Sequence, residues 1–97
     1  MYKIINSQLL IDFWQRHPET EEPLKAWYFD VKEQSWQKPA DVFLTFPKAI
    51  PEDNNQISFP IFLNHYYLMT SLHYHFKTLV IRCVGSFQQL NDPEIIS

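Results

Sequence analysis

Apolar and polar residues alternate through the stretch NHYYLMTSLHYHFKTLVIRCV, Asn64 to Val84. Side chains two residues apart share one side of a β-strand, so this pattern predicts two strands joined as a hairpin. We place the turn at Phe76-Lys77, with His75 facing Thr78. One side is then predicted to face the core: Tyr66, Leu68, Thr70, Leu72, Tyr74, Leu79, Ile81 and Cys83. The other is predicted to face a partner: His65, Tyr67, Met69, Ser71, His73, Val80, Arg82 and Val84.

The residues before this hairpin change from a period of two to a period of three to four, which is typical of helices. After a short strand at Tyr2 to Ile5, Ser7 is expected to cap a first helix that ends at Pro18. Thr20 is expected to cap a second helix. The predicted buried stripes of these two helices are Leu10, Phe13, Trp14 and His17, and Leu24, Trp27, Tyr28 and Val31.

A third, shorter helix is predicted from Pro39 to Pro47, followed by a polar loop over 51–55. A strand with Ile57, Phe59 and Ile61 on one side comes next, and Pro60 indicates that it lies at an edge of the sheet or carries a bulge. The sequence therefore predicts one α+β domain over residues 1–97. Its N-terminal helices pack on one face of a small, mainly antiparallel sheet.

The composition of the chain limits the classes of protein to which it can belong. The chain has 97 residues, 45% of them hydrophobic, and a single cysteine, Cys83, which excludes an intrachain disulfide and is expected to be a small core residue. No apolar run approaches the roughly 20 residues needed to cross a bilayer, and the N-terminus lacks the order of a signal peptide. We therefore expect a soluble, cytoplasmic protein that does not bind membranes.

The charges are unevenly distributed along the chain. The net charge is -3, yet residues 54–91 contain Lys77, Arg82 and three histidines with no carboxylate. That half of the domain can accept an anion such as a phosphate. His73 and His75 could share a metal ion on a regular strand, but two ligands do not make a zinc site, so we expect neither a metal nor another cofactor.

The segment FWQRHPETEEPLKAWYFDVKEQSWQKPADV, Phe13 to Val42, followed by Phe46-Pro47, resembles the N-terminal half of the HigB-type toxins of bacterial toxin-antitoxin pairs. It includes the signature Trp-x-x-Pro-Ala-Asp at Trp36 to Asp41, and the resemblance continues to Gly85. It implies a RelE-like fold and an mRNA endonuclease, also called an mRNA interferase, that acts mostly on translated messages at the ribosome. It also implies a cognate helix-turn-helix antitoxin encoded alongside.

The site residues of this family are replaced here. Where such toxins usually carry Lys-Tyr-Arg-Leu, this chain has His65-Tyr66-Tyr67-Leu68, and where they carry Gly-Thr-His and then a tyrosine, it has Gly85-Ser86-Phe87 and Leu90. One interpretation is a displaced nuclease site with His65 as base and Arg82 as phosphate clamp. RNA would then also contact Tyr67, His73 and Lys77. The alternative is a non-catalytic protein that binds an antitoxin or regulates through this scaffold.

Overall fold

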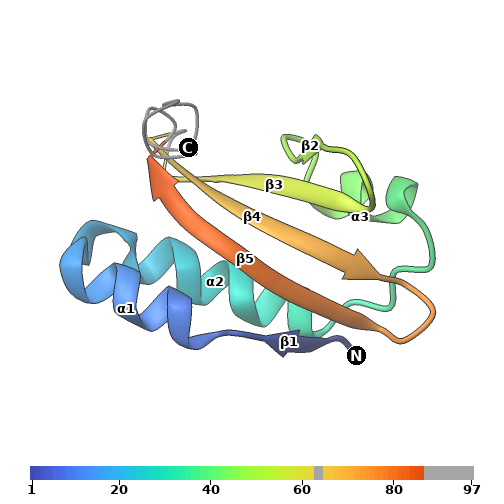
Figure 1. Cartoon of the computed structure of the whole chain (residues 1–97), viewed down its shortest axis with the longest axis horizontal. Coiled ribbons are helices and arrows are strands. Elements are labelled where there is room, and N and C mark those ends of the chain that lie inside the picture. Colours follow the sequence, from blue (N-terminus) through green and yellow to red (C-terminus); the bar gives the residue numbers. More distant parts are fainter. Residues whose placement is uncertain (63–64, 87–97) are drawn as a thin grey trace.

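The computed structural model describes residues 1–62 and 65–86. It contains three α-helices and one five-stranded sheet (Figure 1). The helices are α1 (Gln8–Arg16), α2 (Glu21–Lys32) and α3 (Pro39–Thr45), with a 3-10 turn η1 (Pro18–Thr20) before α2. The strands are β1 (Lys3–Ile5), β2 (Ile50–Pro51), β3 (Gln56–Ile61), β4 (Tyr66–His73) and β5 (Thr78–Ser86). None of the helices in the described part of the chain is long and apolar enough to span a membrane.

The sheet has the strand order β1-β5-β4-β3-β2. All neighbours are antiparallel except β1 and β5, which pair in parallel. In Figure 1, α1 and α2 run alongside β1 and β5, while α3 lies near β2. The predicted α+β architecture with a mainly antiparallel sheet is therefore confirmed, and it agrees with a RelE-like fold.

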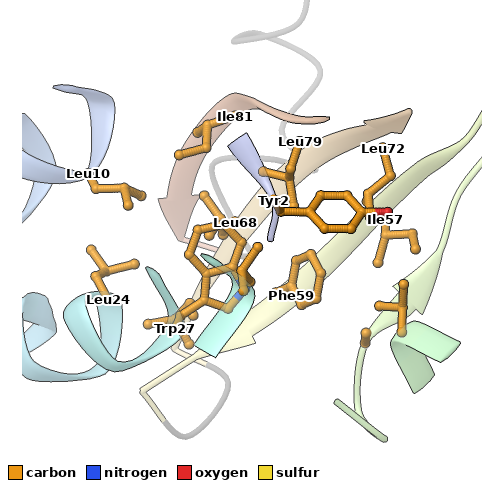
Figure 2. Packing of buried hydrophobic residues seen from close by; sticks show 14 of the residues in the cluster. Tyr2, Leu10, Leu24, Trp27, Ile57, Phe59, Leu68, Leu72, Leu79 and Ile81 are labelled. Carbon is orange, nitrogen blue, oxygen red and sulfur yellow. The ribbon is translucent and has the colours of Figure 1, made fainter. Parts of the chain in front are cut away.

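The hydrophobic core fills the space between the helices and one face of the sheet (Figure 2). Trp27 of α2 lies edge to face on Phe59 of β3, with ring centroids 5.4 Å apart. Alternate residues of the strands complete the core, as a period of two requires. The fully buried members include Leu10, Leu24, Val31, Val42, Phe59, Leu68, Leu72, Leu79 and Ile81.

The junction between α1 and α2 differs from the expected capping. Thr20 is fully buried in η1, and its hydroxyl donates to the carbonyl of His17 at 2.7 Å. Because η1 runs directly into α2, Thr20 has helical dihedral angles, and its side chain makes no cap hydrogen bond. Ser7 makes none either. Ser7 and Thr20 thus occupy the N-cap positions, as predicted, but neither side chain makes the hydrogen bond that such a residue usually supplies.

The hairpin turn includes the predicted Phe76-Lys77 but begins two residues earlier. His73, not His75, pairs with Thr78, and the chain turns over Tyr74 to Lys77. Lys77 has a φ of 49°, and its N–H donates to the carbonyl of Tyr74 at 3.2 Å. Because the pairing of β4 with β5 is shifted by two residues, the same side chains of β4 share each face of the sheet as predicted.

A β-bulge changes the second strand of the hairpin. Thr70 pairs with Ile81, but the next residue, Met69, pairs with Cys83, so Arg82 has no partner in the ladder. One inserted residue reverses the alternation beyond it. Val84, predicted to face a partner, packs against the core. Cys83, predicted to face the core, stands beside Met69 on the other face, and Ser71 pairs with Val80 rather than lying opposite Arg82.

Pro60 occupies the edge position that its missing N–H requires. β2 is only two residues long and pairs with Ile57 and Ser58. Beyond that point the outer edge of β3, which includes Pro60, has no neighbouring strand among the described residues. β3 is therefore next to the edge strand rather than at the edge, but Pro60 lies in the part of β3 that β2 does not cover.

Candidate nucleic-acid interface

The sheet face opposite the helices carries the residues that alternate with the core. Strand pairing arranges them in rows across the sheet, since paired residues point to the same side. From the hairpin turn outward, the rows are Lys3, Thr78 and His73; then Ile5, Val80, Ser71 and Gln56; then Cys83, Met69, Ser58 and Ile50; then Gly85, Tyr67 and Pro60. We call this surface the open face.

Arg82 stands at the centre of the open face. It lies in the bulge, level with Met69 and Thr70 of β4, and its side chain is exposed. Bulges commonly re-aim one side chain out of a sheet, and here the re-aimed group is a guanidinium, which suits phosphate recognition. Lys3, also exposed, lies roughly 13 Å away along β5, at about 3.3 Å per residue over four residues.

No carboxylate stands in any row of the open face. Residues 54–62 and 65–86 contain no aspartate or glutamate at all. The open face therefore presents two cations, Arg82 and Lys3, and the imidazole of His73. No negative side chain in its rows competes with an anion for them. This arrangement fits a polyanion such as RNA better than the overall charge of -3 suggests.

Cys83 stands on the open face but is not prepared to act as a nucleophile. Its thiol is partly buried, and this burial raises its pKa. Because the thiolate is the reactive form, a raised pKa keeps Cys83 inert near neutral pH. The chemistry of the open face therefore rests on its nitrogen-containing side chains and on the phenol of Tyr67.

The two predicted catalytic residues are not adjacent. His65 lies in the turn before β4, where its N–H donates to the carbonyl of Phe62 at 3.0 Å and its ring packs against the Phe62 ring at 5.7 Å. Arg82 is level with Met69, which lies three residues along β4 from Tyr66, the neighbour of His65, and this corresponds to about 10 Å of strand. Tyr67 is the open-face residue between them. A substrate would have to bridge this distance to engage both.

The predicted RNA contacts at the hairpin turn have different surroundings. The Lys77 ammonium donates to the main-chain carbonyl of Trp36 at 2.8 Å, so it serves to hold the turn against the loop after α2. His73 is exposed at the end of β4, and His75 lies beyond that end, so the two do not share one regular strand. No group of three or more metal-ligating side chains occurs within residues 1–62 and 65–86.

Reasoning from the sequence missed one cluster of titratable and aromatic side chains. On the helix side of the sheet, the Tyr66 hydroxyl donates to a carboxylate oxygen of Glu19 at 2.6 Å. This hydrogen bond is the main reason that the pKa of Glu19 is lowered and that of Tyr66 is raised. His17 stacks on Phe13 with centroids 4.4 Å apart and approaches the Tyr66 ring at 5.4 Å. The Tyr66 and Glu19 pair spans 47 positions, so no local pattern announces it.

Comparison with known protein families identifies the family of this chain. The sequence model of the HigB toxin family, described as the RelE-like toxic component of a toxin-antitoxin system, matches residues 20–92. A search of the curated proteins finds none that matches the chain. The family match covers most of the 97 residues, and the α+β fold agrees with it. The chain therefore belongs to the HigB toxin family and is the RelE-like toxic component of a toxin-antitoxin system.

Proposed function

We propose that this toxin is an mRNA endonuclease and that its open face contacts the RNA. The observation that carries the proposal is the exposed Arg82 guanidinium on a β-bulge, at the centre of a surface without a carboxylate. Lys3 and His73 extend the same surface toward the hairpin turn. Phosphate groups supply most of the affinity of proteins for nucleic acids, and they need cations that no carboxylate neutralises.

For cleavage without a metal, we propose roles for three residues. His65 takes the 2'-hydroxyl proton, and the 2'-oxygen attacks the phosphorus while the bond from phosphorus to the 5'-oxygen breaks. Arg82 stabilises the charge that develops on the phosphate, and solvent water supplies the proton for the leaving 5'-oxygen. Tyr67 stacks on a base between His65 and Arg82. Because about 10 Å of strand, from Tyr66 to Met69, lies between them, the His65 and Arg82 side chains must lean toward one another above Tyr67 to share one phosphate. We do not assign RNA contact to Lys77, because its ammonium holds the Trp36 carbonyl.

The setting of the reaction follows from the family. A toxin of this kind has an antitoxin partner. We propose that the antitoxin is a helix-turn-helix protein, that the substrate is mRNA under translation at the ribosome, and that the toxin acts in the cytoplasm. A ribosome-bound message is an extended single strand, and a sheet face with spaced cations can accept such a strand.

Induced expression of the chain tests the proposal. We expect growth arrest and transcripts cut within their coding regions, and we expect Arg82→Ala to relieve both effects. Arg16→Ala is the matched control, because Arg16 is exposed on the helix side, where its guanidinium lies over the Phe13 ring at 6.0 Å. Equal toxicity of the Arg82→Ala and wild-type proteins, both folded, would remove Arg82 from the site.

A second function is favoured by the separation of His65 and Arg82 and by the structural use of Lys77. On this reading, the chain keeps the scaffold and the antitoxin-binding surface but does not cleave RNA. Unchanged growth and intact messages after induction, together with tight antitoxin binding, would support this non-catalytic role. A His65→Ala variant that cuts messages at the wild-type rate would exclude His65 as the base without excluding nuclease activity.

A further inference from the structure

Two serine side chains lie at the floor of the open face. Ser58 is 4% exposed and Ser71 is 8% exposed, although both stand on the face opposite the helices. Strand pairing explains their burial, because each serine has a longer side chain on either side of it in its row: Val80 and Gln56 beside Ser71, and Met69 and Ile50 beside Ser58. The short serines therefore lie below their neighbours and give the open face a polar floor at these two positions.

The fold uses neither serine hydroxyl. In the described ranges 1–62 and 65–86, neither has a hydrogen-bond partner, whereas the Thr70 hydroxyl, on the core side of β4, donates to the Ile57 carbonyl at 2.9 Å. The unpaired side-chain atoms sealed from solvent in these ranges are the Trp27 indole nitrogen and the Tyr74 hydroxyl, so both serine oxygens are open to solvent. Because polar groups at such depth normally have a partner, two open hydroxyls here suit a ligand that forms hydrogen bonds.

The two serines and Arg82 form one group across three strands. Val80 pairs with Ser71, so Arg82, two residues beyond Val80, is the diagonal neighbour of Ser71 across β4 and β5. Met69 pairs with Ser58, so Ser71 is in turn the diagonal neighbour of Ser58 across β3 and β4. Diagonal neighbours in a sheet are about 7 Å apart. An exposed guanidinium and two open hydroxyls therefore follow one another at a spacing close to that of groups along a sugar-phosphate backbone.

We propose that Ser58 and Ser71 bind the 2'-hydroxyl of the ribose next to the phosphate that Arg82 holds, and that they make the open face selective for RNA over DNA. This inference rests on the proposed function, in which RNA contacts the open face through Arg82. A 2'-hydroxyl can donate one hydrogen bond and accept another. Two hydrogen bonds of about 2.8 Å span about 5.5 Å, which fits two serine side chains on diagonal neighbours about 7 Å apart. Deoxyribose lacks this hydroxyl and would leave both serines without it.

The position of the two serines also gives the RNA a direction on the sheet. His65 lies to one side of Arg82 along β4, and Ser71 lies to the other, toward the hairpin turn. The 2'-hydroxyl that His65 is proposed to deprotonate belongs to the nucleotide on the 5' side of the phosphate. The ribose held by the serines therefore belongs to the nucleotide on the 3' side, and its 2'-hydroxyl takes no part in the attack. The strand runs from 5' to 3' toward the hairpin turn.

Equilibrium binding of matched RNA and DNA strands tests the proposal. The strands are short, single-stranded and identical in sequence, with uracil in both, and every protein carries His65→Ala so that the RNA is not cut. We expect the RNA to bind about fivefold more tightly than the DNA, the effect of one hydrogen bond. Ser58→Ala combined with Ser71→Ala should reduce this ratio to about one by weakening RNA binding alone. Ser35→Ala, at an exposed serine between α2 and α3, is the matched control and should leave the ratio unchanged.

Arg82→Ala separates this inference from the proposed function, because RNA and DNA share their phosphates. It should weaken the binding of both strands, and circular dichroism verifies that all variants fold. If it does so while the double serine variant keeps the preference for RNA, or if the parent protein binds both strands equally, the inference alone is overturned. Equal weakening of RNA and DNA by the serine variant would also overturn it, since the serines would then contact phosphate. If Arg82→Ala weakens neither strand, the proposed RNA contact fails and the inference fails with it.

Discussion

The Trp36 carbonyl joins three distant parts of the chain. It accepts one hydrogen bond from the Tyr2 hydroxyl and one from the Lys77 ammonium, each at 2.8 Å. Tyr2 precedes β1, Trp36 lies between α2 and α3, and Lys77 ends the hairpin turn. Tyr2 and Trp36 are 2% and 3% exposed, so water has little access to the carbonyl.

Removal of one donor leaves the carbonyl with the other. Tyr2→Phe should lower the free energy of unfolding by about 1 kcal/mol, the net value of one hydrogen bond. Lys77→Met keeps the aliphatic stem and removes the ammonium, and it should cost about 1 to 2 kcal/mol, since the donor is charged but only partly buried. The double variant leaves a buried acceptor unpaired, which adds about 1 to 3 kcal/mol beyond the sum of the two.

Urea unfolding of the four proteins in this cycle, followed by circular dichroism, measures the coupling. Lys38→Met, at an exposed lysine, serves as the control and should leave stability within about 0.5 kcal/mol of the wild type. Single-variant costs that add to within about 0.5 kcal/mol would refute the shared-carbonyl argument. If Lys77→Met lost RNA affinity without losing stability, Lys77 would instead be an RNA contact.

Three further outcomes follow from burial, ionisation and charge. Leu79 is fully buried, so Leu79→Ala should lower the free energy of unfolding in urea by about 2 to 5 kcal/mol. Leu44 is 83% exposed, so Leu44→Ala should change this free energy very little. Similar losses in the two variants would contradict the assigned core. Burial raises the pKa of Tyr2 from 10.0 to about 12, so the stability it contributes is intact below pH 10 and falls as the pH rises toward 12. A titration of unfolding free energy should show this loss in the wild type relative to Tyr2→Phe, and parallel curves would contradict it. Arg82→Ala should reduce the slope of log affinity for RNA against log salt by about one; an unchanged slope would exclude a phosphate contact.

The sequence predicts the fold class and most of the core because its periodicities are simple. The stripe of α2 and the alternation of β4 depend only on residues close together in the chain. Leu24 and Trp27 are buried as the stripe requires, and Leu68 and Leu72 are buried as the alternation requires. The bulge at Arg82 could not be predicted in this way. It leaves no mark in residue type, yet it exchanges the sides of the residues that follow it on β5, Cys83 to Ser86.

The candidate site is less accessible to sequence reasoning than the core. The turn before Thr78 carries no Asn-Gly pair, and a lysine with a φ of 49° is not a residue that turn chemistry favours. The turn therefore begins earlier than predicted, although Arg82 is exposed as predicted. The bond between Tyr66 and Glu19, and the unpaired indole N–H of Trp27, arise from tertiary packing and have no local sequence signal.

One measurement tests most directly whether RNA meets the open face. The chain has two methionines, and Met69 stands beside Cys83 at the level of the bulge. With both methyl groups labelled with carbon-13, titration with a short single-stranded RNA is predicted to shift the Met69 methyl resonance, and to do so less in the Arg82→Ala variant. RNA that binds tightly while the Met69 resonance stays unmoved would contradict the assignment of the open face.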